Sequence, residues 1–256
     1  MIRIKRVIFS QILLLIFKLI GRVWFLNAYW SIDHYYKNLS TIQKNRLAKK
    51  VLKNFAYQIA EIAALNRNSD YKFKEVVFEN LDTIDKSVNN IILCGHFRNT
   101  DLISYALGRK AKVFLIFEFL ENSFLRERIK KLRNQFLQAI HWKSLKNSLK
   151  ENSEGLFIIP SDLKDNDSPY VFPFLGYSFP FPSLGAKMAE EMNLPIYYMD
   201  ISYRNGKYLA SFYEIESISI DQSLNQFSIL IEKNITNAPE LYNWHLHSHK
   251  EMAQLV

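Results

Sequence analysis

Residues 91–101 have the sequence Ile91-Ile92-Leu93-Cys94-Gly95-His96-Phe97-Arg98-Asn99-Thr100-Asp101, in which an apolar run ends at a glycine and polar residues follow. The apolar run is typical of a buried strand, and the glycine lets the chain bend sharply before the histidine. Asn99 or Thr100 can cap a helix that continues to Leu107. The stretch therefore predicts a strand that turns into a helix, where functional residues of α/β folds collect.

Short apolar segments alternate with helical segments over most of the chain. The apolar pattern predicts strands at residues 75–78, 90–94, 112–117, 155–159, 195–202 and 207–214. Helical periodicity predicts helices at residues 40–65, 99–107, 122–139, 183–192 and 224–235. This alternation is typical of an α/β fold with a largely parallel central sheet flanked by helices.

The composition excludes two classes of protein. With 48% hydrophobic and 14% aromatic residues in 256, the chain can bury a large core and is not disordered. Its single cysteine excludes an internal disulfide framework and is compatible with a reducing compartment. The sequence therefore predicts a folded protein that faces the cytosol.

The net charge of +8 is concentrated near the N-terminus. Residues 1–69 contain 12 Lys and Arg against two acids, Asp33 and Glu61, which gives +10 there and −2 for the remainder. A basic segment on a nearly neutral body predicts a polyanionic partner, which could be nucleic acid or anionic lipid.

The residues around those charges favour lipid. Residues 7–17 are uncharged and mostly apolar, but the run is too short for an uninterrupted spanning helix. Lys18 and Arg22 fall on one side of the predicted helix, and Trp24 and Trp30 follow. Such a helix can lie in the membrane interface. We expect a membrane-anchoring segment at 1–35 ahead of one domain at 36–256; the alternative is an ordinary amphipathic helix packed on the domain.

Five sequence blocks follow one another in an informative order. They are His96 to Asp101, Pro160-Ser161-Asp162, Val171-Phe172-Pro173-Phe174-Leu175-Gly176, Leu184-Gly185-Ala186-Lys187-Met188-Ala189, and Pro239-Glu240-Leu241-Tyr242-Asn243-Trp244. Together they resemble the bacterial lipid A biosynthesis acyltransferases, which are lauroyl/myristoyl transferases within the lysophospholipid and glycerolipid acyltransferase superfamily. The resemblance extends over almost the whole chain.

The resemblance implies a membrane-associated O-acyltransferase. The donor would be a thioester of acyl carrier protein or coenzyme A, and the acceptor a hydroxyl of a membrane glycolipid such as a lipid A precursor. It also implies a location at the bacterial inner membrane, beside anionic lipid, with the active site facing the cytoplasm. No metal, cofactor or nucleic acid is expected.

The resemblance makes the H-x4-D pair catalytic. A hydroxyl needs a base to become nucleophilic at neutral pH, and neutral His96 would take its proton. Asp101 would hold the other ring nitrogen and stabilise the imidazolium. Further residues are expected to bind substrate: Arg98, Asn99, Arg133, Asp162, Phe174 and Gly176. Arg98 stands where the family usually has a glycine.

Two alternatives stay open. Cys94 precedes His96 by two residues, so a Cys/His thioester hydrolase is possible, although a lone cysteine in an apolar run is more often buried and inert. The second alternative is a non-enzymatic basic module that binds membrane or nucleic acid and whose H-x4-D spacing is accidental.

Overall fold

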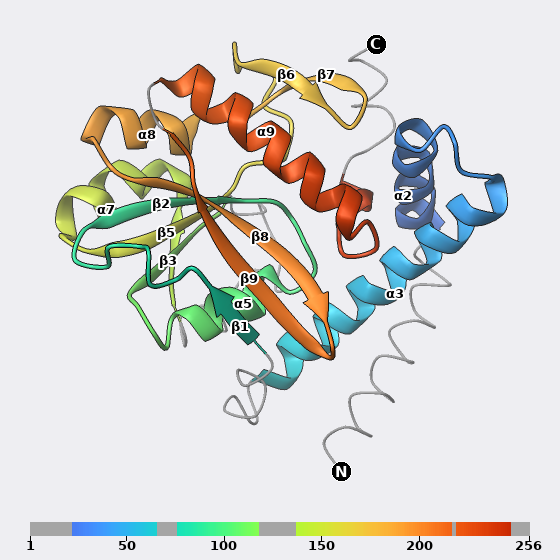
Figure 1. Ribbon diagram of the computed structural model, residues 1–256, viewed down its shortest axis with the longest axis horizontal. Coiled ribbons are helices and arrows are strands. Elements are labelled where there is room, and N and C mark those ends of the chain that lie inside the picture. The colour runs from blue at the N-terminus through green and yellow to red at the C-terminus, as the bar shows by residue number, and fades with distance from the viewer. Residues whose placement is uncertain (1–21, 66–75, 118–136, 217–218, 247–256) are drawn as a thin grey trace.

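The computed structural model describes residues 22–65, 76–117, 137–216 and 219–246 (Figure 1). Its centre is a seven-stranded sheet in the order β1-β9-β8-β2-β5-β3-β4. The strands are β1 (Val76–Glu79), β2 (Asn89–Cys94), β3 (Val113–Phe117), β4 (Gln138–His141), β5 (Gly155–Pro160), β8 (Ile196–Arg204) and β9 (Lys207–Glu214). Strands β8, β2, β5, β3 and β4 are parallel neighbours, whereas β9 pairs antiparallel with β8 and carries β1 parallel to itself. The expected largely parallel α/β sheet is confirmed.

Helices flank this sheet. The helices α8 (Leu184–Met192) and α9 (Ile220–Asn237) pack against β2 and β8, and α5 (Thr100–Leu107) packs on β3 (Figure 1). All six residues of β2 are buried, as expected for a parallel strand that is covered on both faces. A β-carbon on Gly185 would lie 2.6 Å from Leu93 Cδ2, so glycine allows α8 to approach the sheet closely.

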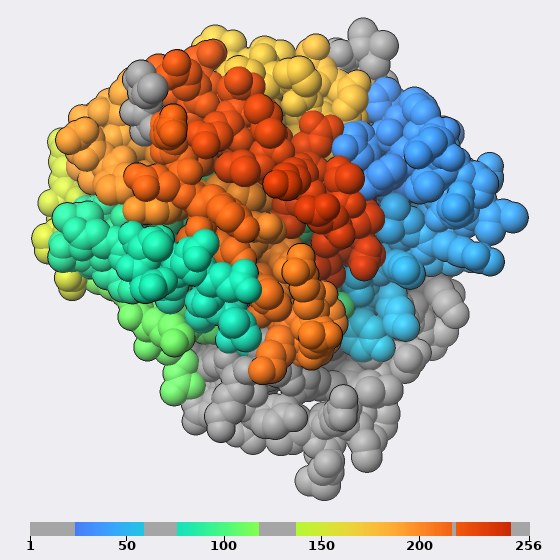
Figure 2. Space-filling model, in the orientation of Figure 1, coloured from blue at the N-terminus to red at the C-terminus, as the bar shows by residue number. Residues whose placement is uncertain are grey.

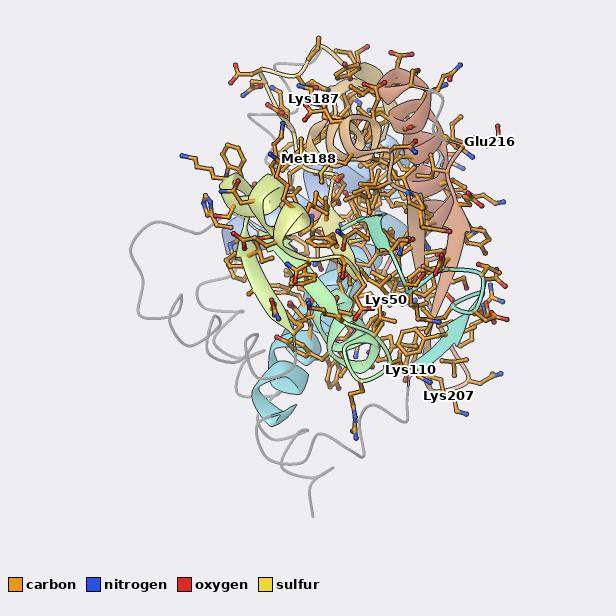
Figure 3. The ribbon with its side chains drawn as sticks, turned by 90° about the vertical axis from the view of Figure 1, so that its left-hand side faces the viewer. Lys50, Lys110, Lys187, Met188, Lys207 and Glu216 are labelled. Carbon is orange, nitrogen blue, oxygen red and sulfur yellow. The ribbon has the colours of Figure 1, made fainter. Side chains whose placement is uncertain are left out.

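Helical periodicity explains the packing of α9. Its buried apolar residues follow a spacing of three and four: Leu224, Phe227, Ile231 and Ile235. The Ser219 side chain caps the helix by accepting a hydrogen bond from the Gln222 backbone N–H at 3.3 Å. Figure 3 shows side chains filling the space around the sheet; on α8, Lys187 is exposed and its neighbour Met188 is buried.

The first two described helices lie beside the C-terminal segment (Figure 2). Helix α2 (Arg22–Tyr35) packs against α3 (Thr41–Leu65) and against the short helix η2 (Trp244–Leu246). Ser40 and Gln43 form a capping box at the start of α3: the Ser40 N–H donates to Gln43 Oε1 at 2.8 Å, and the Gln43 N–H donates to Ser40 Oγ at 3.4 Å. The predicted helix at 40–65 therefore begins with Ser40 as its N-cap.

The structure differs from the sequence-based expectations in three places. Residues 138 and 139, expected at the end of a helix, belong to strand β4, while residues 122–136 of that helix lie outside the described ranges. Two further elements were not predicted: a hairpin of β6 (Val171–Phe174) and β7 (Tyr177–Pro180), and helix α7 (Leu145–Glu151), which follows the short helix η1 (Trp142–Ser144).

Most of the predicted anchor, residues 1–21, also lies outside the described ranges. Among the residues that the structure covers, no helix is both long enough and apolar enough to cross a membrane.

Candidate active site

His96 lies two residues beyond the carboxyl end of β2, in the turn that leads to α5. A β-carbon on Gly95 would lie 2.7 Å from Ile231 Cδ1 and 2.8 Å from Phe97 Cε2, so a side chain there would press on α9 and on the loop itself. Glycine thus lets the chain turn tightly against α9. The side chain of His96 is 28% exposed, which leaves the ring accessible to a reactant.

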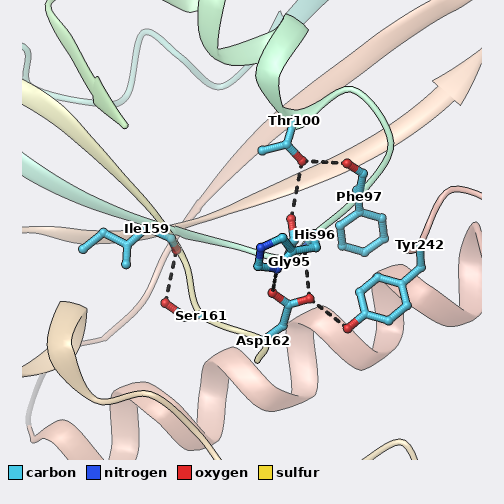
Figure 4. Close-up of polar contacts among 8 residues, drawn as sticks. All are labelled: Gly95, His96, Phe97, Thr100, Ile159, Ser161, Asp162 and Tyr242. Carbon is cyan, nitrogen blue, oxygen red and sulfur yellow. Dashed lines mark hydrogen bonds and ion pairs between the residues drawn. The ribbon is translucent and has the colours of Figure 1, made fainter. Parts of the chain in front are cut away.

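Asp162 meets His96 because of the register of two parallel strands. Cys94 at the end of β2 pairs with Pro160 at the end of β5, and each site residue follows two positions later. The Asp162 carboxylate is fully buried, and its Oδ1 lies 2.5 Å from His96 Nδ1 (Figure 4). Its Oδ2 accepts the backbone N–H of His96 at 2.9 Å. One carboxylate therefore holds both the ring and the backbone of the histidine.

A third donor to this carboxylate comes from the C-terminal segment. The Tyr242 hydroxyl donates to Asp162 Oδ2 at 2.8 Å (Figure 4). Tyr242 is completely buried, and burial, followed by the charge of Asp162, raises its pKa well above the usual value. The phenol is therefore protonated at neutral pH and acts as a donor to Asp162.

The contact with Asp162 determines what the imidazole can do. A carboxylate without solvent contact accepts donors, so the proton of neutral His96 resides on Nδ1. The basic lone pair is then on Nε2. An imidazole held in this way can take a proton from a reactant while the carboxylate stabilises the resulting positive charge.

The acid of the H-x4-D motif itself lies on a different element from Asp162. Asp101 is half-buried in the first turn of α5. Asp101 was expected to orient the histidine ring; the side chain at Nδ1 in the structure is that of Asp162, which was expected to bind substrate. The charges of both carboxylates influence the Cys94 thiol, which shows that both lie near the end of β2.

Comparison with known proteins identifies the chemistry that this arrangement serves. The family model described as "Bacterial lipid A biosynthesis acyltransferase" matches residues 35–251. The chain belongs to this family. The resemblance stated from the sequence blocks is confirmed, and the protein is an acyltransferase.

This acyltransferase also matches a solved structure, the 1-acyl-sn-glycerophosphate (LPA) acyltransferase PlsC from Thermotoga maritima. The two share 14% sequence identity, and the match has a TM-score of 0.43 and covers 93% of this chain and 99% of that chain. No curated protein sequence matches the chain significantly.

Cys94 does not have the properties of a nucleophile in this acyltransferase. The thiol is fully buried on β2, and burial, followed by the charges of Asp162 and Asp101, raises its pKa well above the usual value. A thiol that stays protonated and out of contact with solvent is a poor nucleophile. The expected burial of Cys94 is confirmed, which weakens the hydrolase alternative.

Arg98 joins the histidine loop to its surroundings. Its Nη1 donates to Asn54 Oδ1 on α3 at 2.9 Å. Its guanidinium carbon lies 5.4 to 5.9 Å from the centroids of three tyrosine rings, within range for cation–π attraction. These rings belong to Tyr57, Tyr203 and Tyr208. The guanidinium, expected to bind substrate, thus contacts α3 and the β8–β9 hairpin of the acyltransferase.

The remaining predicted substrate residues have different settings. Asn99 is fully buried with a left-handed backbone (φ 66°) at the start of α5, where its side chain makes no capping bond. Phe174 is buried against Phe179 and Phe181. Gly176 occupies the β6–β7 turn with φ 78°, a conformation that favours glycine. Arg133 lies outside the described ranges.

Proposed function

We propose that this acyltransferase is membrane-associated and transfers a fatty acyl chain from a thioester to a hydroxyl of a glycolipid such as a lipid A precursor. The thioester would be carried by acyl carrier protein or by coenzyme A. The observation that carries the proposal is the contact of His96 Nδ1 with buried Asp162, because it leaves Nε2 as the basic atom. The family match supports a lipid as acceptor.

In the proposed reaction, His96 Nε2 takes the proton of the acceptor hydroxyl as its oxygen attacks the thioester carbonyl. The tetrahedral intermediate collapses, the C–S bond breaks, and the departing sulfur takes the proton back from the imidazolium. The products are an ester and a free thiol, and His96 returns to its neutral state. No covalent acyl-enzyme is required.

The two carboxylates have separate roles in this proposal. Asp162 orients the ring and stabilises the imidazolium through a charge-assisted bond at Nδ1. Asp101, the acid of the H-x4-D motif, contributes a second negative charge near the end of β2. A similar arrangement of carboxylate and imidazole accelerates acyl transfer in serine hydrolases. In those enzymes the nucleophile is a side chain of the enzyme itself.

Exposed side chains on α2 and α3 support the membrane part of the proposal. Trp24, Leu26 and Trp30 on α2 are exposed large apolar residues. On α3, Lys49 and Lys50 are exposed. Exposed aromatic, apolar and basic groups are the kinds of side chain that suit the boundary of an anionic bilayer. We place the protein at the bacterial inner membrane, with its active site toward the cytoplasm.

The test is to supply the purified protein with an acyl thioester, with and without a lipid A precursor, and to follow thiol release and lipid mass. We expect slow release alone and accelerated release with an acylated lipid when the acceptor is present, because a bound hydroxyl has a large advantage over water. Fast thiol release that ignores the acceptor and yields only free fatty acid would identify a hydrolase instead.

A further inference from the structure

We propose that Tyr242 is a positioning residue that lowers the basicity of His96 through Asp162 and thereby sets the pH range of acyl transfer. The inference rests on the proposed role of His96 as the base. It adds a third member, from the C-terminal end of the fold, to the pair formed at the ends of β2 and β5.

Three hydrogen-bond donors contact the carboxylate of Asp162 at its two oxygens. Oδ1 lies 2.5 Å from the imidazole Nδ1. Oδ2 accepts both the backbone N–H of His96 at 2.9 Å and the Tyr242 hydroxyl at 2.8 Å. Donors on Oδ2 draw negative charge away from Oδ1, which weakens the attraction of Oδ1 for an imidazolium.

The position of the Tyr242 hydroxyl is set by packing and by backbone hydrogen bonds. The N–H of Arg98 donates to the Leu241 carbonyl at 2.6 Å, and the N–H of Asn243 donates to the His96 carbonyl at 3.0 Å. The Tyr242 ring also packs against Phe97 at 5.2 Å and Trp244 at 5.3 Å between centroids. The segment around Tyr242 is thus fixed to the same loop that carries His96, and the hydroxyl is directed at Asp162.

Other titratable groups near His96 do not supply this effect. Titratable groups that interact with Asp162 or with the end of β2 include Cys94 on β2, Asp101 on α5 and Tyr198 on β8. Burial raises the pKa of Cys94 and of Tyr198, so both remain neutral. The carboxylate of Asp101 is present both in the wild type and in a Tyr242 variant, so it does not account for a difference between their His96 pKa values. A change at Tyr242 therefore reaches His96 through Asp162.

The direction of the change in the His96 pKa follows from the loss of one hydrogen-bond donor to Asp162. Removing the Tyr242 hydroxyl leaves more negative charge on Asp162, which stabilises the imidazolium and raises the pKa of His96. We expect Tyr242→Phe to raise this pKa by about half to one unit, a fraction of the shift that a whole opposite charge produces. The acid limb of the pH profile of kcat should move to higher pH by the same amount, and KM should stay within about twofold of wild type.

The matched control is Tyr198→Phe. It removes another fully buried hydroxyl, which donates to Asn234 Oδ1 at 2.9 Å rather than to Asp162. Loss of a buried hydrogen bond destabilises both variants to a similar degree. Only Tyr242→Phe should shift the His96 titration, which separates a role in positioning from a role in stability.

The direct readout is the NMR titration of His96 in the full-length protein labelled with 15N-histidine, with the resonance assigned by its loss in His96→Gln. Site-specific 3-fluorotyrosine at position 242 provides a second variant that keeps the ring and hydroxyl. Its more acidic phenol is a stronger donor, so the pKa of His96 should fall. An unchanged or lower His96 pKa in Tyr242→Phe, or an unchanged or higher one with 3-fluorotyrosine, overturns the inference.

The titration does not require turnover. If His96 shifts as expected but no acyl transfer is found, the proposed function fails while the link from Tyr242 to His96 stands. If acyl transfer is found but the pKa of His96 is the same in the Tyr242 variants as in the wild type, only the influence of Tyr242 on His96 is refuted.

Discussion

Replacing Asp162 with asparagine should inactivate the enzyme by reversing the tautomer of His96. An amide has one oxygen and one NH2 group, whereas the Asp162 carboxylate accepts donors at both oxygens. The backbone N–H of His96 cannot rotate, so the amide oxygen must remain where Oδ2 now lies. The NH2 group then faces Nδ1, which must accept, and the ring proton moves to Nε2.

The size of the effect follows from that geometry. With the proton on Nε2 the imidazole has no lone pair for the acceptor hydroxyl, and kcat should fall about 10³- to 10⁴-fold, as in a serine protease triad with a reversed tautomer. Two charge-assisted bonds from His96 become neutral ones, so the free energy of unfolding should fall by about 1–3 kcal/mol. KM for both substrates should change little.

The assay is thiol release from an acyl thioester in the presence of the lipid acceptor, with the fold checked by circular dichroism and thermal unfolding. Asp167→Asn is the matched control, because it makes the same chemical change at an exposed carboxylate a few residues along the chain. A folded Asp162→Asn protein with kcat within about threefold of wild type would refute the reasoning, since general-base loss is far larger.

Three other predictions follow from the site and the N-terminus. His96→Ala should lower kcat by about 10² to 10⁴ without unfolding the protein, and near-normal turnover would exclude His96 as the base. Cys94→Ala should keep acyl transfer within a few-fold of wild type, because the thiol is buried and protonated; complete loss in a folded variant, with an acyl-cysteine found by mass spectrometry in the wild type, would indicate covalent catalysis. Removing residues 1–21 should shift the protein from the membrane to the soluble fraction, because interfacial affinity combines apolar insertion with attraction of basic residues to anionic lipid; unchanged sedimentation with membranes would place the anchor elsewhere.

The sequence allowed six of the seven strands of the central sheet to be predicted, because these six are largely apolar segments. Strand β2 is buried along its whole length, so its pattern is unambiguous. Strand β4 has no such pattern: its four residues are exposed or half-buried at the edge of the sheet, and they follow a segment of helical periodicity. The hairpin of β6 and β7 was missed for a related reason, since each strand has four residues and β6 includes Pro173.

The site was predictable only in part, because its contacts depend on strand order. The sequence indicated His96 by its place between a strand and a helix. The contact with Asp162 requires that β5 lie beside β2 with Cys94 opposite Pro160, and no local pattern gives that register. Tyr242 is 80 residues from Asp162 along the chain, and its hydrogen bond has no local sequence signal.

The backbone link between residues 241–243 and the His96 loop has a consequence for synthesis. Ribosomes produce β2 and β5 well before Tyr242, so a nascent chain can pair these strands and bring His96 to Asp162 while the third donor is still missing. The histidine loop gains its backbone partners at Leu241 and Asn243 only when almost the whole described chain has been made. The partners that complete the proposed base are therefore synthesised after both strands, and a chain that stops before residue 240 would contain His96 and Asp162 without the segment that fixes them.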